Sequence, residues 1–233
     1  MIFGRKIAVK FFAMYIVSAQ AAFSADCALG LAFALDVSSS VNSAEYEIQK
    51  GGLADALRNP EVREAILVNP GAVRFLAYEW SGALQQAIIV DWSVMSNAAA
   101  IDRFAASLDA HQRLYAKSST ALGQGIAFGV RQFAALPATC DRQVIDVSGD
   151  GVSNDGVTPD ALRASGRLNR ITINGLVIKG ASPDPVSYYR EKVIHGPDAF
   201  MMTARNGFED YPDLIKGKLL KELRPPIFIG VVR

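Results

Sequence analysis

The sequence predicts an α/β fold of three layers, in which a doubly wound, mostly parallel central sheet with one antiparallel edge hairpin strand lies between helices. Two observations support this prediction. Segments typical of strands alternate along the chain with segments of helical periodicity, which is the pattern of a sheet covered on both faces. The first strand-like segment, residues 28–35, is an unbroken apolar run, as expected of a strand buried on both sides.

Taken in order, the expected strands are residues 28–35, 71–78, 85–92, 142–148, 171–179 and 199–204, the last of them an edge strand. The segment between the second and third strands, residues 79–84, is too short for a parallel crossover. These two strands should therefore pair as an antiparallel hairpin.

The expected helices are residues 43–58, 61–67, 96–108, 120–133, 158–168, 185–194 and 210–223. Asn42 and Glu45 are spaced as a capping box before the first of them, and Thr158 with Pro159 forms a strong helix start. Gly125 and Gly129 would let their helix approach the sheet closely. The apolar residues 227–233 are left without an assignment.

The amino terminus has the layout of a secretory signal peptide. A basic start (Arg5, Lys6 and Lys10) precedes an apolar stretch over residues 11–17 and small residues that offer cleavage after Ala21, Ser24 or Ala25. The apolar stretch is shorter than the roughly 20 residues that span a bilayer, and a buried first helix is the alternative. We expect residues 1–24 to be a signal peptide and residues 25–233 one domain, periplasmic or secreted, with no membrane span after cleavage.

Composition narrows the possible functions. Removing residues 1–24 takes three of the 24 basic residues and none of the 23 acidic ones, which leaves 21 basic residues and a formal charge of about −2. This balance argues against nucleic-acid binding. The sequence has two cysteines and two histidines, which are few ligands for a zinc site. Export would place both cysteines where disulfides persist.

Hard oxygen donors gather in three loops that follow predicted strands or precede a predicted helix. Asp36, Ser38 and Ser40 follow the first strand, Thr120 opens a helix, and Asp150 follows the strand at 142–148. Because parallel strands end at the same edge of a sheet, these loops should meet there. Two carboxylates and three hydroxyl groups suit Mg²⁺ best, with Mn²⁺ or Ca²⁺ as alternatives.

The runs ALDVSSS, STALGQGI and VSGDG, in this order and spacing, resemble the von Willebrand factor type A (vWA) domain, which has a Rossmann-like fold. In particular, the chain is similar to a bacterial exported branch of that family with unassigned function. The resemblance implies a metal-ion-dependent adhesion site at Asp36, Ser38, Ser40, Thr120 and Asp150. We expect the metal there to accept an acidic side chain from a partner protein.

One loop departs from the family pattern. The third loop reads Ser148-Gly149-Asp150-Gly151 where the family commonly has Thr-Asp-Gly, so no ligand role is assigned to Ser148. Asp146, on the preceding strand, is interpreted as a hydrogen-bonded structural carboxylate.

The resemblance also bears on the cysteines, because the family's sheet order places the strands that end at Asp36 and Asp150 side by side. Cys27 and Cys140 would then begin these strands at the opposite edge, close enough for a disulfide. We expect a Cys27–Cys140 disulfide. Two free buried thiols are the alternative.

An enzyme is the main rival interpretation. Phosphatases of the haloacid dehalogenase type also place an Asp at the end of the first strand, but they need a second acidic residue two positions on, where Ser38 stands. The Gly-x-Ser-x-Gly string of serine hydrolases is absent from the sequence. We expect no enzymatic activity; a metal-dependent phosphohydrolase and a metal-free scaffold are the alternatives. His111 and His195 are interpreted as surface or structural residues. Trp80 and Trp92 are interpreted as capping the core, with a binding surface as the alternative.

Overall fold

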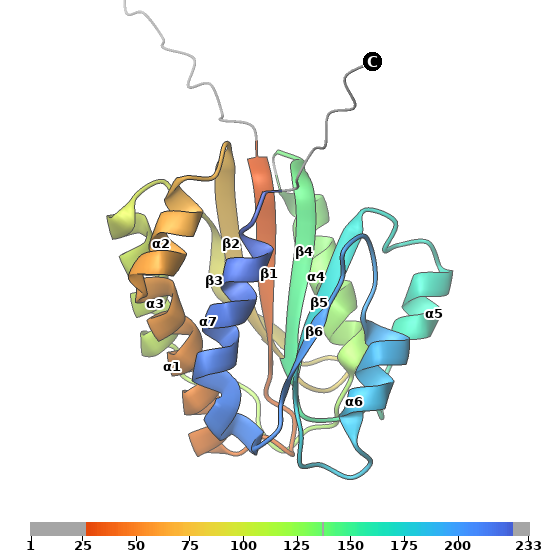
Figure 1. The fold of residues 1–233 in the computed structure, drawn as a ribbon. Helices are drawn as coiled ribbons and strands as arrows, with labels where there is room; N and C mark the ends of the chain where they lie inside the picture. Colours follow the sequence, from red (N-terminus) through yellow and green to blue (C-terminus); the bar gives the residue numbers. More distant parts are fainter. Residues whose placement is uncertain (1–26, 137, 226–233) are drawn as a thin grey trace, which may run out of the picture.

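The computed structural model describes residues 27–136 and 138–225, so the expected signal peptide and residues 227–233 lie outside it. One sheet has the strand order β3-β2-β1-β4-β5-β6 (Figure 1). Strand β3 is antiparallel to β2, and the other neighbouring strands are parallel. The fold class and the hairpin are therefore confirmed. The strands are β1 (Cys27–Asp36), β2 (Ala72–Trp80), β3 (Gln86–Val94), β4 (Cys140–Gly149), β5 (Ile171–Ile178) and β6 (Met201–Ala204).

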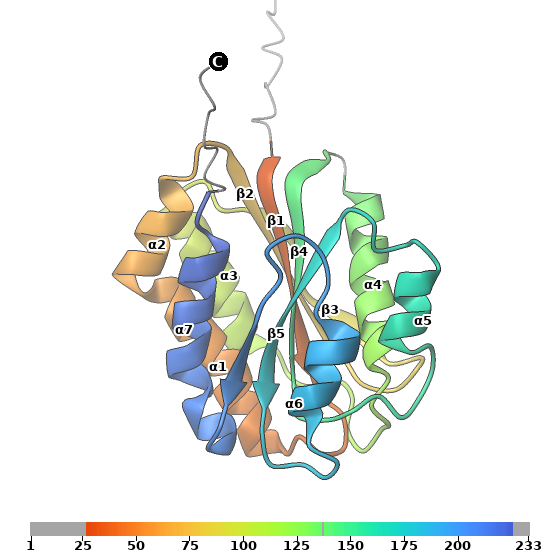
Figure 2. The ribbon, with the colours of Figure 1, turned by 45° about the vertical axis from the view of Figure 1, so that its right-hand side comes forward.

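Helices cover both faces of the sheet (Figure 2). One layer contains α1 (Ser43–Arg58), α2 (Pro60–Leu67), α3 (Ala98–Ala110) and α7 (Tyr211–Glu222). The other contains α4 (Leu122–Ala135), α5 (Pro159–Ala164), α6 (Pro185–Tyr188) and the π-helical turn η1 (Tyr189–Val193). None of the helices in the described part of the chain is both long and apolar enough to cross a bilayer.

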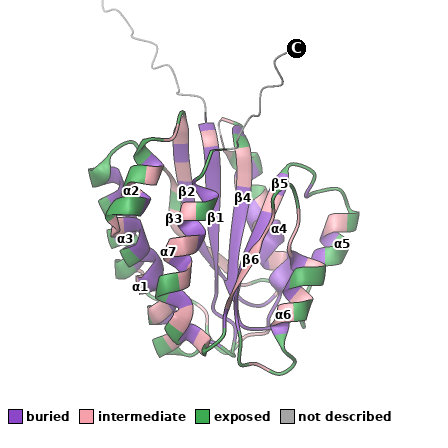
Figure 3. Cartoon of the chain, viewed as in Figure 1, coloured by how far each residue is buried: buried purple, intermediate pink, exposed green. Residues whose placement is uncertain are grey.

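Strand β1 lies at the centre of the sheet and is buried on both faces, as its unbroken apolar sequence predicts (Figure 3). Leu31 and Phe33 are among the β1 side chains that enter the core beneath α1, α3 and α7. Ala32 and Ala34, pointing the other way, enter the core beneath α4. The small side chains on this second face leave room for α4 to approach.

Two glycines set how closely α4 approaches the sheet, as expected from the sequence. A β-carbon at Gly125 would lie 2.8 Å from the Trp80 ring. One at Gly129 would lie 2.6 Å from the Tyr78 hydroxyl. Trp80 itself is fully buried, so the structural interpretation of this tryptophan is confirmed.

Cys27 and Cys140 form a disulfide between the first residues of β1 and β4, with their Cα atoms 4.4 Å apart. The two residues are paired in the parallel register of these strands. The expected disulfide is therefore confirmed, and it lies at the edge of the sheet opposite to the ends of β1 and β4.

Local differences from the expected elements have physical reasons. The helix expected over residues 158–168 ends at Ala164, because Gly166 turns the chain with a φ of 74°. The helix expected over 185–194 changes to π-helical geometry at Tyr189. The last helix begins at Tyr211, one residue after the expected start, and a 3₁₀ turn, η2 (Gly207–Asp210), precedes it.

A buried ion cluster attaches α7 to the sheet. The Lys218 ammonium group lies 2.7 Å from Oδ1 of Asp146 on β4 and 2.5 Å from Oε1 of Glu222, one turn further along α7. All three side chains are buried. Asp146 is thus a structural carboxylate, as interpreted from the sequence, although its partner is an ammonium group on a distant helix.

Candidate functional site

Asp36 ends β1 at the carboxyl edge of the sheet, which we define as the edge where the parallel strands end. Its carboxylate is fully buried, and Oδ1 accepts a hydrogen bond of 2.7 Å from the backbone N–H of Ser38. The backbone oxygen of Asp36 accepts a bond of 3.0 Å from the Gln49 amide on α1. These contacts fix the first turn of the loop that carries Ser38 and Ser40.

A chain of hydrogen bonds connects this loop to the end of β4. The hydroxyl oxygens of Ser38 and Ser40 lie 3.2 Å apart, and the Ser40 hydroxyl donates to Oδ1 of Asp150 at 2.6 Å. Ser40 and Asp150 are 110 residues apart in sequence. The adjacency of β1 and β4 brings them together, because both loops leave the sheet at the same edge.

Thr120 precedes α4 and lies in the same group of loops. A β-carbon at Gly151 would be 3.6 Å from the Thr120 hydroxyl oxygen and 3.9 Å from that of Ser40, so both hydroxyl groups border Gly151. The Thr120 N–H donates to the Asn154 side chain at 2.9 Å. All five residues that the sequence singles out therefore lie together at the carboxyl edge.

One carboxylate oxygen in this group has no hydrogen-bond partner among the described residues. Within that part of the chain, Oδ2 of Asp36 is buried and unpaired, and so is the hydroxyl group of Tyr189 on η1. A β-carbon at Gly149 would lie 2.7 Å from Asp36 Oδ2 and 2.5 Å from the Tyr189 hydroxyl. Buried carboxylate oxygens are normally paired, so the free oxygen marks a place where a ligand is expected.

The same burial changes the acidity of both carboxyl groups. Burial, followed by the negative charge of Asp150, raises the pKa of Asp36 to about 7. Burial also raises the pKa of Asp150. Ionised carboxylates at this edge are therefore held at a cost that a nearby positive charge would offset.

Arg113 holds the loop between β1 and α1 and was not singled out by the sequence. Its guanidinium group donates to three backbone oxygens of that loop, those of Val37, Ser38 and Val41, at 2.6, 3.2 and 2.8 Å. The loop that carries Arg113 is itself held by the buried Glu79, which accepts from the backbone N–H of Leu114 at 2.9 Å.

Glu79 also lies 3.0 Å from Nε2 of His111, so the structural interpretation of that histidine is confirmed. The sequence gives no signal for the roles of Arg113 and Glu79, because their contacts depend on the path of an irregular loop.

The donor set fits a hard divalent cation. Within residues 27–136 and 138–225, no group of three or more His, Cys, Asp and Glu side chains is arranged to hold a metal ion. A cation at this edge would therefore rely on hydroxyl groups as well as on the carboxylates of Asp36 and Asp150. Such oxygen donors suit Mg²⁺, Mn²⁺ or Ca²⁺ better than softer metals.

Sequence comparison assigns the family. Residues 26–227 match the family described as "Protein of unknown function (DUF1194)". The chain belongs to the DUF1194 family. No curated protein matches this DUF1194 chain significantly in sequence.

Several solved structures have similar folds, and one of them is described as von Willebrand factor type A. One is a von Willebrand factor type A structure from Catenulispora acidiphila, 14% identical, with a TM-score of 0.60 over 85% of this chain and 43% of that one. Another is proximal thread matrix protein 1 from the mussel byssus "with zinc occupied MIDAS motif", 14% identical, with a TM-score of 0.59 over 86% of this chain and 48% of that one.

A third is the pilus adhesin SpaC from Lactobacillus rhamnosus GG, 11% identical, with a TM-score of 0.61 over 84% of this chain and 31% of that one. The DUF1194 chain thus spans less than half the length of these three proteins. At these identities the likeness concerns the fold, and the fold of this DUF1194 protein is that of a vWA domain.

Proposed function

We propose that the protein is an exported domain that binds a partner protein through a divalent cation. Asp36, Ser38, Ser40, Thr120 and Asp150 would hold the cation, with Mg²⁺ preferred and Mn²⁺ or Ca²⁺ as alternatives. The observation that carries this proposal is the buried, unpaired Oδ2 of Asp36, next to a chain of hydroxyl groups that ends at Asp150.

With a cation bound, the site would suit an anionic partner. Asp36 and Asp150 supply two negative charges, and the three hydroxyl groups supply oxygen donors without further charge. A divalent cation bound there would supply an electrophilic centre that attracts a carboxylate from outside. Asp36 and the serines would orient that centre, while Arg113 keeps the loop in place.

Proteins of similar fold support an interaction role. The mussel protein is described with a zinc-occupied MIDAS motif, and SpaC is described as a pilus adhesin. We propose an adhesion role for this chain as well, because its own oxygen donors gather in the loops at the carboxyl edge of the sheet. We propose binding without catalysis.

Export is the second part of the proposal. It rests on the signal-like sequence of residues 1–24, and the Cys27–Cys140 disulfide agrees with an oxidising compartment. We propose that the processed protein works in the periplasm or outside the cell, where cations and acidic surface proteins are available to it.

Calorimetric titration of the oxidised protein with Mg²⁺, Mn²⁺ and Ca²⁺ tests the cation site. We expect binding to the wild type and a loss of about tenfold or more in affinity for Asp36→Asn, because one charged ligand is removed. Asp213→Asn, at an exposed position in the first turn of α7, is the matched control and should bind like the wild type. Absence of cation binding to the wild type would refute the site.

Capture from a cell-envelope extract tests the partner. The immobilised wild-type protein should retain a partner in Mg²⁺ and release it when a chelator is added, whereas Asp36→Asn should retain none.

A panel of phosphoesters tests the rival function. Cation-dependent turnover that Asp36→Asn abolishes would favour a phosphohydrolase over our proposal.

A further inference from the structure

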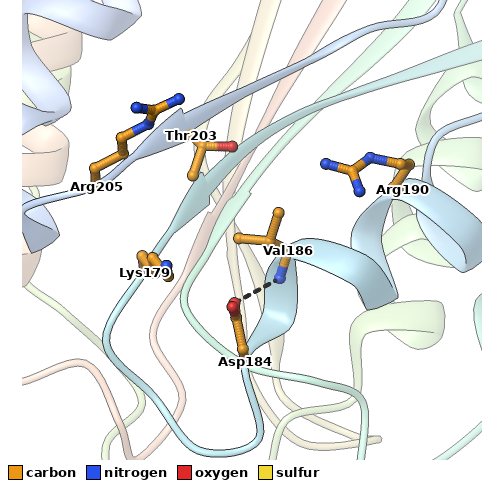
Figure 4. Close-up of a pocket in the computed structure, with 6 residues that line it drawn as sticks. All are labelled: Lys179, Asp184, Val186, Arg190, Thr203 and Arg205. Atoms are coloured by element: carbon orange, nitrogen blue, oxygen red, sulfur yellow. Dashed lines mark hydrogen bonds between the residues drawn. The ribbon is translucent and has the colours of Figure 1, made fainter.

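Two surface cavities lie next to each other at the carboxyl edge and share Lys179 and Arg205. The first, of about 540 Å³, is also lined by Ser40 and Asp150 of the candidate cation site. The second, of about 360 Å³, is lined by Lys179, Asp184, Val186, Arg190, Thr203 and Arg205 (Figure 4). Together they form one trough that leads from the candidate cation site past β5 and β6.

The topology explains why basic side chains line this trough. Lys179 directly follows β5 and Arg205 directly follows β6, so both leave the sheet at the edge where Asp36 and Asp150 lie. Arg190 comes from η1, on the other side of the second cavity. Figure 4 shows the side chains of Arg190 and Arg205 approaching Thr203 from opposite sides.

These three basic side chains are exposed, and none forms an ion pair with a carboxylate of the described residues. Two acidic residues outside the candidate site also line the trough, but each is engaged in a helix cap. Glu45 accepts from the Asn42 backbone N–H at 2.7 Å, and Asp184 accepts from the Val186 N–H at 3.0 Å. Both carboxylates keep their charge, but the second cavity still has three basic side chains against the single carboxylate of Asp184, and so it has a net positive charge.

We propose that this trough selects an acidic protein segment carrying several carboxylates. The inference rests on the proposed function: one carboxylate of the segment would meet the cation, and neighbouring carboxylates would pair with Lys179, Arg205 and Arg190. All three positive charges line the second cavity, and Lys179 and Arg205 also line the first, so positive charge extends from the second cavity towards the candidate cation site, which suits a segment with several carboxylates. The half-buried Val186 adds apolar surface for the intervening residues.

Fluorescence anisotropy with two labelled peptides of equal length tests the inference. One peptide carries four aspartates and the other carries one, and each is titrated with the oxidised protein in Mg²⁺ and in chelator. We expect the wild type in Mg²⁺ to bind the four-aspartate peptide about tenfold more tightly, with a preference that weakens as salt is added. The triple variant Lys179→Ala, Arg190→Ala, Arg205→Ala should lose this preference and keep its affinity for Mg²⁺.

The double variant Arg103→Ala, Arg167→Ala removes exposed positive charges elsewhere and should keep the preference. A triple variant that still prefers the four-aspartate peptide would overturn the inference, as would a wild type that binds Mg²⁺ but shows no preference. Binding of anionic phospholipid vesicles, but of neither peptide, would also overturn it. Failure of the proposed function is seen separately, as absence of Mg²⁺ binding in calorimetry.

Discussion

Arg113 shows how a single side chain can organise a loop that has little regular structure. Three backbone oxygens of the loop between β1 and α1 accept hydrogen bonds from its guanidinium group. Hydrogen bonds from charged donors are stronger than neutral ones, and the planar fork of arginine can serve several acceptors at once. The positions of Ser38 and Ser40 therefore depend on a residue about 75 positions away.

We predict that Arg113→Ala lowers both the stability of the protein and its cation affinity. The free energy of unfolding should fall by about 1–3 kcal/mol, because three backbone acceptors lose a charged donor. Mg²⁺ affinity should fall several-fold as the loop loosens. Arg113→Lys keeps the positive charge but lacks the planar guanidinium group, so its stability and its Mg²⁺ affinity should lie between those of the wild type and Arg113→Ala. Urea unfolding and calorimetry provide the two measurements.

The exposed Arg103 on α3 is the matched control, and Arg103→Ala should leave both quantities unchanged. An Arg113→Ala variant with wild-type Mg²⁺ affinity would contradict the role assigned to this residue in the site.

Among single residues, the sequence predicts the site residues that directly follow a strand. It does not predict residues that reach the site through an irregular loop or turn. Asp36, Ser38 and Ser40 are predictable because they directly extend a buried strand whose end is fixed. Tyr189 is not predictable as a neighbour of Asp36, since its hydroxyl group reaches the site only through the π-helical turn η1. Arg113 lies in an irregular segment for which no periodicity exists.

At the scale of elements, α7 is attached to the sheet by charge as well as by apolar packing. Burial, followed by the nearby Glu222, raises the pKa of Asp146 to about 7, while Lys218 acts in the opposite direction. Between about pH 4 and pH 7 the native protein therefore holds a proton at Asp146 that the unfolded chain releases. The stability that Asp146 contributes accordingly falls as the pH rises through this range.

We predict that Lys218→Met destabilises the protein by about 3–5 kcal/mol at pH 8, because it leaves buried carboxylates without their ammonium partner. Removing Lys218 raises the pKa of Asp146 further, so at pH 5 Asp146 is protonated in both proteins. The deficit should therefore be smaller at pH 5 than at pH 8 in urea unfolding. Lys216→Met, which breaks only a partly exposed pair with Glu61, should cost about 1 kcal/mol or less.

An equal deficit at both pH values would show that the Lys218 ammonium group does not compensate the charge of Asp146.

The disulfide is a second attachment between elements. We predict that the double variant Cys27→Ala, Cys140→Ala loses about 2–4 kcal/mol of unfolding free energy, because the unfolded chain is no longer closed over 113 residues. Its Mg²⁺ affinity should stay near that of the wild type, since the cysteines lie at the opposite edge from Asp36. A thiol that can be alkylated in the unreduced wild-type protein would contradict the disulfide.

Elements with a strong periodic or apolar pattern are predicted well, and those that depend on chain geometry are not. The central strands follow from continuous apolar runs, and the β2–β3 hairpin follows from the short segment between them. The early end of α5 depends on Gly166 adopting a positive φ, which no periodicity records. The change from α- to π-helical geometry at Tyr189 is likewise not recorded by any periodicity of the sequence.

At the scale of the whole molecule, the two edges of the sheet have different chemistry. The carboxyl edge gathers the oxygen donors of the candidate cation site and the basic trough beside it. The opposite edge holds the Cys27–Cys140 disulfide, and the last described residues after α7 also lie there (Figure 1). The candidate binding surface and the first and last described residues are thereby separated by the length of the strands.

We predict that a bacterial host exports the full chain and shortens it. The intact mass of the exported protein should correspond to removal of residues 1–21, 1–24 or 1–25, with the two cysteines oxidised. Replacing Arg5, Lys6 and Lys10 by glutamate should retain the protein in the cytoplasm at full length, because the basic start is needed for export. Full-length protein in the exported fraction would contradict the signal peptide.

The disulfide has a mechanical consequence for a domain that holds on to a partner. If the partner pulls at Asp36 while the domain is held at the opposite edge of the sheet, next to Cys27, the tension runs along β1 from one edge of the sheet to the other. At its far end β1 is bonded covalently to β4, so the two central strands cannot slide past each other at that end until a covalent bond breaks. The pulling force therefore acts on two strands that are linked covalently by the disulfide.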